Sequence, residues 1–180
     1  DGVQANEITS MMGIINGTTN YILTKMNQEG TSYEESLKEA QRLGYAEANP
    51  TADVEGFDAA YKLSILSSLA FHTKVPFSKV FREGITGISK EDIADGKAMG
   101  YVLKLLAIGK QSHDGIEVRV HPTFVRKDHP LAAVNDSFNA VYLTGDSVGD
   151  VMLYGRGAGA LPTGSAIVSD IIYAATHSEN

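Results

Sequence analysis

The pattern of hydrophobic and polar positions changes halfway along the chain. In the first half, apolar residues recur at helical spacing after an opening strand at 7–17. The helices expected there span 18–30, 31–44, 53–72 and 90–100. The second half is typical of strands, at 101–111, 115–125, 139–147 and 150–157, before a last helix at 163–177. This order predicts an α+β fold, with helices packed on one face of a mainly antiparallel sheet.

Local signals place several of these boundaries. Gly30 and Gly44 are typical helix stops, and Ser32 with Glu35 forms a capping box at the start of the second helix. Residues 112–115, "SHDG", predict the turn of a hairpin. Asp53 is the expected N-cap of the longest helix.

Residues 46–62 gather four carboxylates and one amine just before the apolar run "LSILSSLAF". On a wheel of the 53–72 helix, apolar residues occur on every side, which predicts a helix buried all round. Glu55, Asp58 and Lys62 fall within an arc of about 60° that continues as Ile65 and Leu69. Because those two residues are expected in the core, the charges are expected to point inward or into a cleft.

A simpler interpretation of Asp58 and Lys62 stays open. An i,i+4 pair on a solvated helix face is common and contributes only about 0.3–0.5 kcal/mol. Against this, burial of charge costs several kcal/mol unless something requires it. A lysine beside carboxylates is favoured in its protonated form, so Lys62 is suited to donate a proton to a developing alkoxide.

Composition excludes several classes of protein. The net charge of −7 argues against nucleic acid and anionic membranes as partners. The absence of cysteine excludes disulfides and thiolate metal sites, the histidines lack metal-ligand spacing, and no metal site is predicted. No apolar run approaches the length of about 20 residues that spans a membrane. A cytoplasmic protein is expected, and the first residue, Asp1, suggests a piece of a longer one.

Three motifs together resemble the central catalytic domain of the homoserine dehydrogenase family. They are "GIINGTTNYIL" at 13–23, "LGYAEANPTADVEGFDAAYKLSIL" at 43–66 and "GRGAGALPTGSAIVSD" at 155–170. The resemblance implies an NAD(P)-dependent oxidoreductase that interconverts L-homoserine and L-aspartate 4-semialdehyde, on the route to threonine, isoleucine and methionine. NAD or NADP is then the expected cofactor, and the small-molecule substrate is the expected partner.

The resemblance also implies roles for individual residues. Lys62 matches the lysine that gives and takes the proton at the substrate oxygen, and Asp58 matches the carboxylate beside that oxygen. Glu47 matches the glutamate that holds the substrate's amino group, and Asp53 matches an acidic residue important to the site. These carboxylates would meet the ammonium of a zwitterionic substrate.

Three further positions follow from the same resemblance. Thr18 and Tyr45 match residues that line the substrate pocket, and Gly159 matches a position close to the nicotinamide. Asn49 departs from the acidic residue that many relatives carry, so it is left out of the site. The family's dinucleotide-binding domain and its sodium site lie upstream and are absent from these residues, which leaves NAD and NADP undistinguished.

The expected division is a substrate-binding, catalytic and dimerisation domain at 1–160, with a helix at 161–180 that returns to the dinucleotide-binding domain. The long apolar strands at 139–147 and 150–157 predict a homodimer formed through the sheet. "GRGAGA" fits G-x-G-x-x-A, but too little chain follows for a dinucleotide-binding βαβ unit.

Two other functions stay open on the sequence. Lys62 could form a Schiff base in a lyase or aldolase, which requires a lowered lysine pKa that the neighbouring carboxylates oppose. Alternatively, the region could be a non-catalytic dimerisation domain in which the charged cluster is structural.

Overall fold

The sheet is built around the first strand of the chain. The computed structural model describes residues 3–177, and β1 (Ile8–Ile14) runs antiparallel between β3 (Tyr101–Ser112) and β5 (Phe138–Gly145). β4 (Gly115–Arg126) continues the sheet beyond β3, and β6 (Gly149–Arg156) forms the edge beyond β5. The mainly antiparallel sheet expected from the sequence is confirmed.

Two tight hairpins connect neighbouring strands. The turn between β3 and β4 closes where Ser112 pairs with Gly115, as "SHDG" predicts. The turn between β5 and β6 closes where Gly145 pairs with Gly149. The short strand β2 (Phe81–Arg82) lies parallel to β4 at the other edge.

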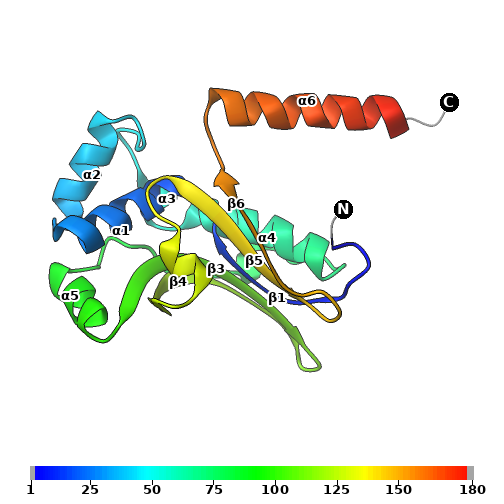
Figure 1. The fold of residues 1–180 in the computed structure, drawn as a ribbon, viewed down its shortest axis with the longest axis horizontal. Coiled ribbons are helices and arrows are strands. Elements are labelled where there is room, and N and C mark those ends of the chain that lie inside the picture. The colour runs from blue at the N-terminus through cyan, green and yellow to red at the C-terminus, as the bar shows by residue number, and fades with distance from the viewer. Residues whose placement is uncertain (1–2, 178–180) are drawn as a thin grey trace.

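Helices cover one face of this sheet (Figure 1). α1 (Gly17–Glu29) and α4 (Phe57–Ala70) lie against the strands, and α2 (Tyr33–Arg42) packs on α1. α5 (Lys90–Ala98) sits at one end, between α1 and β3. The predicted α+β class, with helices on one face of the sheet, is confirmed.

The hydrophobic core is divided by the sheet. The larger cluster joins the helices to the strands through Ile22, Leu23 and Leu63 on one side and Met11, Leu105 and Val120 on the other. A smaller cluster on the second face includes Ile14 and Leu106, and a short 3-10 helix, η2 (Pro130–Ala133), contributes Leu131 to it.

The boundaries predicted for α1 and α2 from capping signals are confirmed. α1 ends at Gly30, whose φ of 69° is in the left-handed region. The capping box of Ser32 and Glu35 is present in full at the start of α2. α2 ends at Arg42, shortly before Gly44.

The long helix expected at 53–72 is broken, so this prediction is wrong. The segment forms α3 (Thr51–Val54) and α4, separated by Gly56 at φ 76°. The N-cap of α3 is Pro50, so Asp53 is not the N-cap that the sequence suggested. The bend brings the chain close to β2 and β4, where a Cβ on Gly56 would lie 3.4 Å from Cγ of Arg82 and from Cγ1 of Val120.

α4 is also less buried than its sequence suggested. Ala60 and Leu63 face the sheet, but Ile65 is 61% exposed and Leu69 is 68% exposed. The expectation that these two residues lie in the core is therefore wrong. Because the sheet occupies only one side of α4, the arc that carries Lys62 continues toward open solvent rather than into the protein.

α6 (Ala160–His177) stands apart from the sheet and from the other helices (Figure 1). None of its residues is buried, and its apolar side chains Ile167, Ile171 and Ile172 are all exposed.

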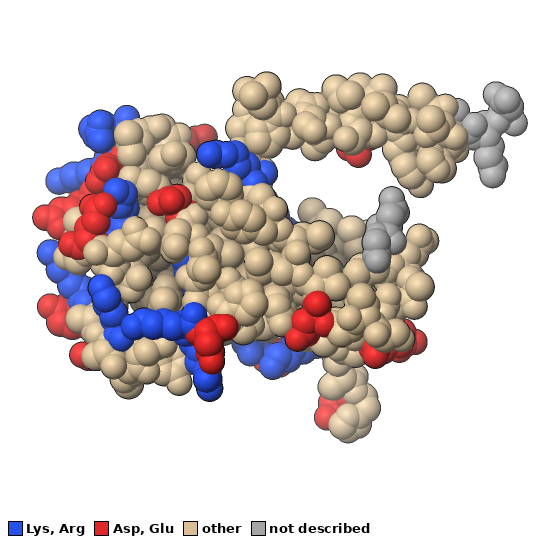
Figure 2. Space-filling model, viewed as in Figure 1, with Lys and Arg blue, Asp and Glu red and all other residues tan. Residues whose placement is uncertain are grey.

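Acidic and basic side chains gather over the end of the molecule that carries α1, α2 and α5 (Figure 2). Within residues 3–177, no helix has the length and hydropathy required to cross a bilayer.

Candidate active site

A cavity of about 480 Å³ opens where the first turn of α1, the loop after α2, the bend between α3 and α4, and the ends of β5 and β6 meet. Every residue expected at the site except Glu47 lines it, namely Thr18, Tyr45, Asp53, Asp58, Lys62 and Gly159. Segments far apart in the sequence are thus brought to one place by the fold.

Asn16 holds the two cavity aspartates together. Its Nδ2 donates to Oδ1 of Asp53 at 2.7 Å and to Oδ2 of Asp58 at 2.9 Å. Its Oδ1 accepts from the backbone N–H of Thr19 at 2.9 Å, as the N-cap of α1. The cap fixes the orientation of the amide, so its N–H groups face the carboxylates. Asn16 is buried, so bulk water offers its amide few alternative partners.

The bend at Gly56 makes this convergence possible. On one continuous helix, Asp53 and Asp58 would point about 140° apart, since successive residues turn by about 100°. With the helix broken, both carboxylates reach the same amide of Asn16. The left-handed glycine therefore positions the site as well as ending a helix.

Lys62 lies beside this pair of carboxylates. Its Nζ donates to Oδ2 of Asp58 at 2.7 Å and to the carbonyl oxygen of Ile15 at 3.0 Å. An ammonium has three N–H donors, so one remains for a ligand in the cavity. The side chains of Lys62 and Asp58 are 46% and 32% exposed, so the ion pair itself adds little to stability. The cleft expected for these charges is present, but it is open to solvent.

Thr18 and Tyr45 join α1 to the loop after α2. Oγ1 of Thr18 donates to the carbonyl oxygen of Tyr45 at 2.7 Å. The ring of Tyr45 packs at a tilt on Tyr21, with 4.7 Å between centroids. Burial raises the pKa of Tyr21, and its ring contact with Tyr45 anchors the loop. Thr18 and Tyr45 therefore form one side of the cavity.

Two of the clustered carboxylates lie elsewhere. Glu47 is exposed and does not line the cavity, although it follows Tyr45 closely in the chain. Its carbonyl oxygen accepts from Nε2 of Gln41 at 3.0 Å, which fixes the backbone at that point. Glu55 accepts from Oγ1 of Thr86 at 2.9 Å and is likewise absent from the lining. The predicted arc of Glu55, Asp58 and Lys62 is therefore only partly realised.

Residues 157–159, named here the glycine wall, also line the cavity. A Cβ on Gly157 would collide with Nδ2 of Asn139, so a larger residue there would displace the Asn139 side chain. Gly159 has φ of 124°, a conformation that favours glycine. Apart from the methyl group of Ala158, the wall presents backbone alone, which suits the close approach of a flat ring.

Sequence reasoning missed Asn16, Ser137, Asn139 and Arg156, all of which line the cavity. Asn16 belongs to a "NGTTN" segment whose N-cap role alone accounts for it, so nothing local reveals its second role. Arg156 is the second residue of "GRGAG", and its charge next to the glycines was the available signal. No group of three or more potential metal ligands occurs in the part of the chain that the structure describes.

Similar proteins identify the family to which this chain belongs. A family model described as homoserine dehydrogenase matches residues 1–172. The homoserine dehydrogenase of Bacillus subtilis is 52% identical over 172 residues, with 96% of this chain and 40% of that protein covered. That of Synechocystis is 54% identical over 171 residues, with 93% and 40% covered. The chain thus spans about 40% of the length of these relatives.

Solved structures give the same result. A homoserine dehydrogenase from Thiobacillus denitrificans superposes with a TM-score of 0.94 at 48% identity, with 96% of this chain and 40% of that one covered. A hyperthermophilic archaeal homoserine dehydrogenase in complex with NADPH superposes with a TM-score of 0.81 at 30% identity, with 98% and 50% covered. The chain belongs to the homoserine dehydrogenase family.

Proposed function

We propose that this chain supplies the substrate-binding and proton-transfer half of an enzyme that interconverts L-homoserine and L-aspartate 4-semialdehyde with NAD(P). The observation that carries the proposal is the joined set of Asn16, Asp53, Asp58 and Lys62 in one cavity. The intact enzyme is this chain together with the rest of a full-length relative, which on this proposal includes the dinucleotide-binding domain.

Lys62 handles the proton at the reacting oxygen. In the reducing direction, its ammonium donates to the oxygen of the aldehyde as that oxygen gains charge. In the oxidising direction, the neutral amine accepts the proton of the hydroxyl. Asp58 and the carbonyl oxygen of Ile15 aim Nζ into the cavity in both directions, since they occupy two of its positions.

The amino group of the substrate is bound by carboxylates. Asp53 lines the cavity and is held by Asn16, so it can meet an ammonium without first being ordered. Glu47 is exposed and follows Tyr45 by two residues on the loop after α2. It contributes to binding by a side-chain movement toward the substrate.

Acceptance or donation of a hydride at carbon is the chemistry that a bound nicotinamide dinucleotide supplies. The residues present fit only one edge of it. The glycine wall, with Gly159, would hold the nicotinamide ring mainly through backbone, and the rest of the dinucleotide would be held outside this chain.

α6 is the second connection to the rest of the enzyme. Its exposed side chains Ile167, Ile171 and Ile172 form an apolar surface that monomeric domains rarely leave bare. We assign residues 1–160 to the substrate-binding, catalytic and dimerisation domain. The segment 161–180 packs on the dinucleotide-binding domain; its residues 178–180 lie outside the described structure.

The enzyme is a homodimer formed through the sheet and acts in the cytoplasm. β6 is an edge strand with exposed apolar residues, Leu153 and Tyr154 among them, which supports pairing with a second copy. Light scattering of this chain at micromolar concentration is expected to give the mass of a dimer. A monomeric mass would contradict this part of the proposal.

The proposed activity is tested by following NADPH absorbance as the intact enzyme oxidises L-homoserine. Turnover with NAD or NADP is expected. Absence of turnover with both cofactors would contradict the proposal. Inactivation by borohydride in the presence of a carbonyl substrate, with label on Lys62, would instead indicate a Schiff-base enzyme.

A further inference from the structure

The charges that line the cavity leave one part of the proposed substrate without a partner. Asp53 and Asp58 are anions, and Nζ of Lys62 already donates to Asp58 and to Ile15. L-Homoserine also carries an α-carboxylate, which must enter a cavity that holds two carboxylates already. Such a group needs a cation of its own, because an unpaired charge near other charges of the same sign is strongly disfavoured.

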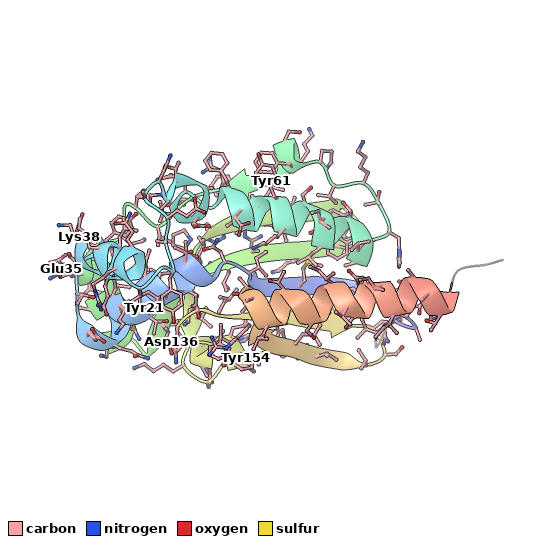
Figure 3. All side chains as sticks on the ribbon, turned by 90° about the horizontal axis from the view of Figure 1, so that it is seen from above. Tyr21, Glu35, Lys38, Tyr61, Asp136 and Tyr154 are labelled. Atoms are coloured by element: carbon pink, nitrogen blue, oxygen red, sulfur yellow. The ribbon has the colours of Figure 1, made fainter. Side chains whose placement is uncertain are left out.

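Arg156 is the remaining cation in the lining of the cavity. It is the last residue of β6, directly opposite Phe138 on β5. The guanidinium carbon lies 4.8 Å from the centroid of the Phe138 ring, a cation–π contact. The other neighbour of Phe138 is Tyr154, labelled in Figure 3, whose ring stacks on it with 5.1 Å between centroids and 11° between planes. The guanidinium is therefore supported by a stacked aromatic pair.

The hydrogen-bonding groups of Arg156 are available. Other arginines are committed, as Arg126 is to Asp128 and Arg119 is to Glu117. Arg156 has neither an ion pair nor a side-chain hydrogen bond to any other residue in the range 3–177. Its five N–H donors form a planar fork, which matches the two oxygens of a carboxylate. Arg156 is exposed, so these donors are open to solvent and to a ligand in the cavity.

We propose that Arg156 binds the α-carboxylate of the substrate and so determines specificity for an amino-acid alcohol over a simple amino alcohol. The inference rests on the proposed function and adds to it the residue that recognises this end of the substrate. Asp53 and Lys62 then meet the ammonium and the hydroxyl, and Arg156 meets the carboxylate from the strand side of the same cavity. The role is one of binding, separate from proton transfer.

The test compares Arg156→Gln and Arg156→Lys in the intact enzyme, with Arg42→Gln as the matched control. Arg42 is an exposed arginine on α2 that does not line the cavity. Two substrates are used: L-homoserine, and 3-aminopropan-1-ol, which has the same amine and hydroxyl but no carboxylate. For Arg156→Gln, the KM for L-homoserine is expected to rise about 10- to 100-fold, with kcat nearly unchanged.

The preference for L-homoserine over the amino alcohol is expected to fall by the same factor in Arg156→Gln. It should fall less in Arg156→Lys, which keeps the charge and loses the fork. The KM for the dinucleotide should stay constant. Circular dichroism and the thermal midpoint, compared with Arg42→Gln, establish that the variants are folded.

Three outcomes would overturn the assignment. If Arg156→Gln leaves the KM for L-homoserine or the preference between the two substrates unchanged, Arg156 does not bind the carboxylate. A raised KM for the dinucleotide alone would place Arg156 at a phosphate instead. If the unsubstituted enzyme fails to oxidise L-homoserine at all, the proposed function fails first and this assignment with it.

Discussion

Lys62 and Lys104 place the same side chain in opposite surroundings. Lys62 is about half exposed, lies in the cavity and pairs with the carboxylate of Asp58. Lys104, on β3, is completely buried, and the groups to which it donates are neutral: the side-chain oxygens of Asn20 and Asn135 and the carbonyl oxygen of Val134. A lysine that must exchange a proton with a ligand needs access to it, whereas a lysine surrounded by fixed acceptors holds the chain in place.

The two regions nevertheless serve one site. Lys104 and Asn20 together bind the segment that precedes β5, because Nδ2 of Asn20 donates to the carbonyl oxygens of Val134 and Phe138. That segment includes Asp136, labelled in Figure 3, and leads directly into Ser137 and Asn139 of the cavity lining. The buried lysine thus supports one side of the cavity that the exposed lysine serves.

The largest expected effect is that of Lys62→Ala on turnover. In the intact enzyme, kcat should fall in both directions by about 10²–10⁴-fold, the usual contribution of a positioned acid or base. The KM for L-homoserine should change less. Steady-state kinetics measure both quantities.

Lys25→Ala is the matched control, because Lys25 also forms an i,i+4 ion pair on a helix but lies outside the cavity. It should leave kcat within about twofold, since exposed pairs contribute little. If kcat falls by less than tenfold in Lys62→Ala and the pH profile of kcat is unchanged, Lys62 is not the proton donor and acceptor.

The second effect concerns stability and pH at Lys104. Burial lowers the pKa of Lys104 from 10.5 to about 8, with Asp136 opposing the shift. Between these values the native state binds fewer protons than the unfolded state, so the free energy of unfolding should rise with pH through this window. Relative to that of Lys104→Met, the free energy of unfolding of the unsubstituted chain should increase by about 3 kcal/mol between about pH 8 and pH 10.5.

Urea unfolding of this chain at several pH values across that window measures the difference. Lys110→Met, an exposed position on the same strand, should follow the unsubstituted chain, since Lys104 is still present in it. Parallel pH profiles for Lys104→Met and the unsubstituted chain would mean that Lys104 does not titrate as its burial implies.

The smallest expected effect is that of Glu47→Gln. If Glu47 binds the substrate's ammonium as proposed, removal of its charge should raise the KM for L-homoserine by about 3- to 10-fold and leave the KM for the dinucleotide unchanged. Glu55→Gln is the control, since Glu55 bonds Thr86 and does not line the cavity. Equal effects of Glu47→Gln on both KM values would make Glu47 a scaffold residue.

The same contrast shows what the sequence could and could not predict. Residue spacing and capping signals gave the fold class and the ends of α1 and α2, because these depend on local chemistry. The break at Gly56 was missed, since a single glycine is tolerated within a helical pattern and its conformation here depends on packing near Val120.

The site was predictable where charges cluster in the sequence and hidden where they are isolated. Asp58 and Lys62 could be predicted as a pair because they are four residues apart on a helix. Lys104 is a lone lysine in an apolar strand, and its acceptors near Val134 come from a separate segment that only the fold brings to it. Likewise, the sequence around Arg156 does not indicate that this residue lines the cavity, because only the fold brings it there.

The most direct test of the central claim uses the 180-residue chain by itself. If it supplies the substrate half alone, the purified chain should be folded yet show no oxidation of L-homoserine. Calorimetry should likewise detect no binding of NADPH at concentrations that saturate the intact enzyme. Measurable turnover by the chain alone would place the cofactor site within these residues and contradict the division of the enzyme proposed here.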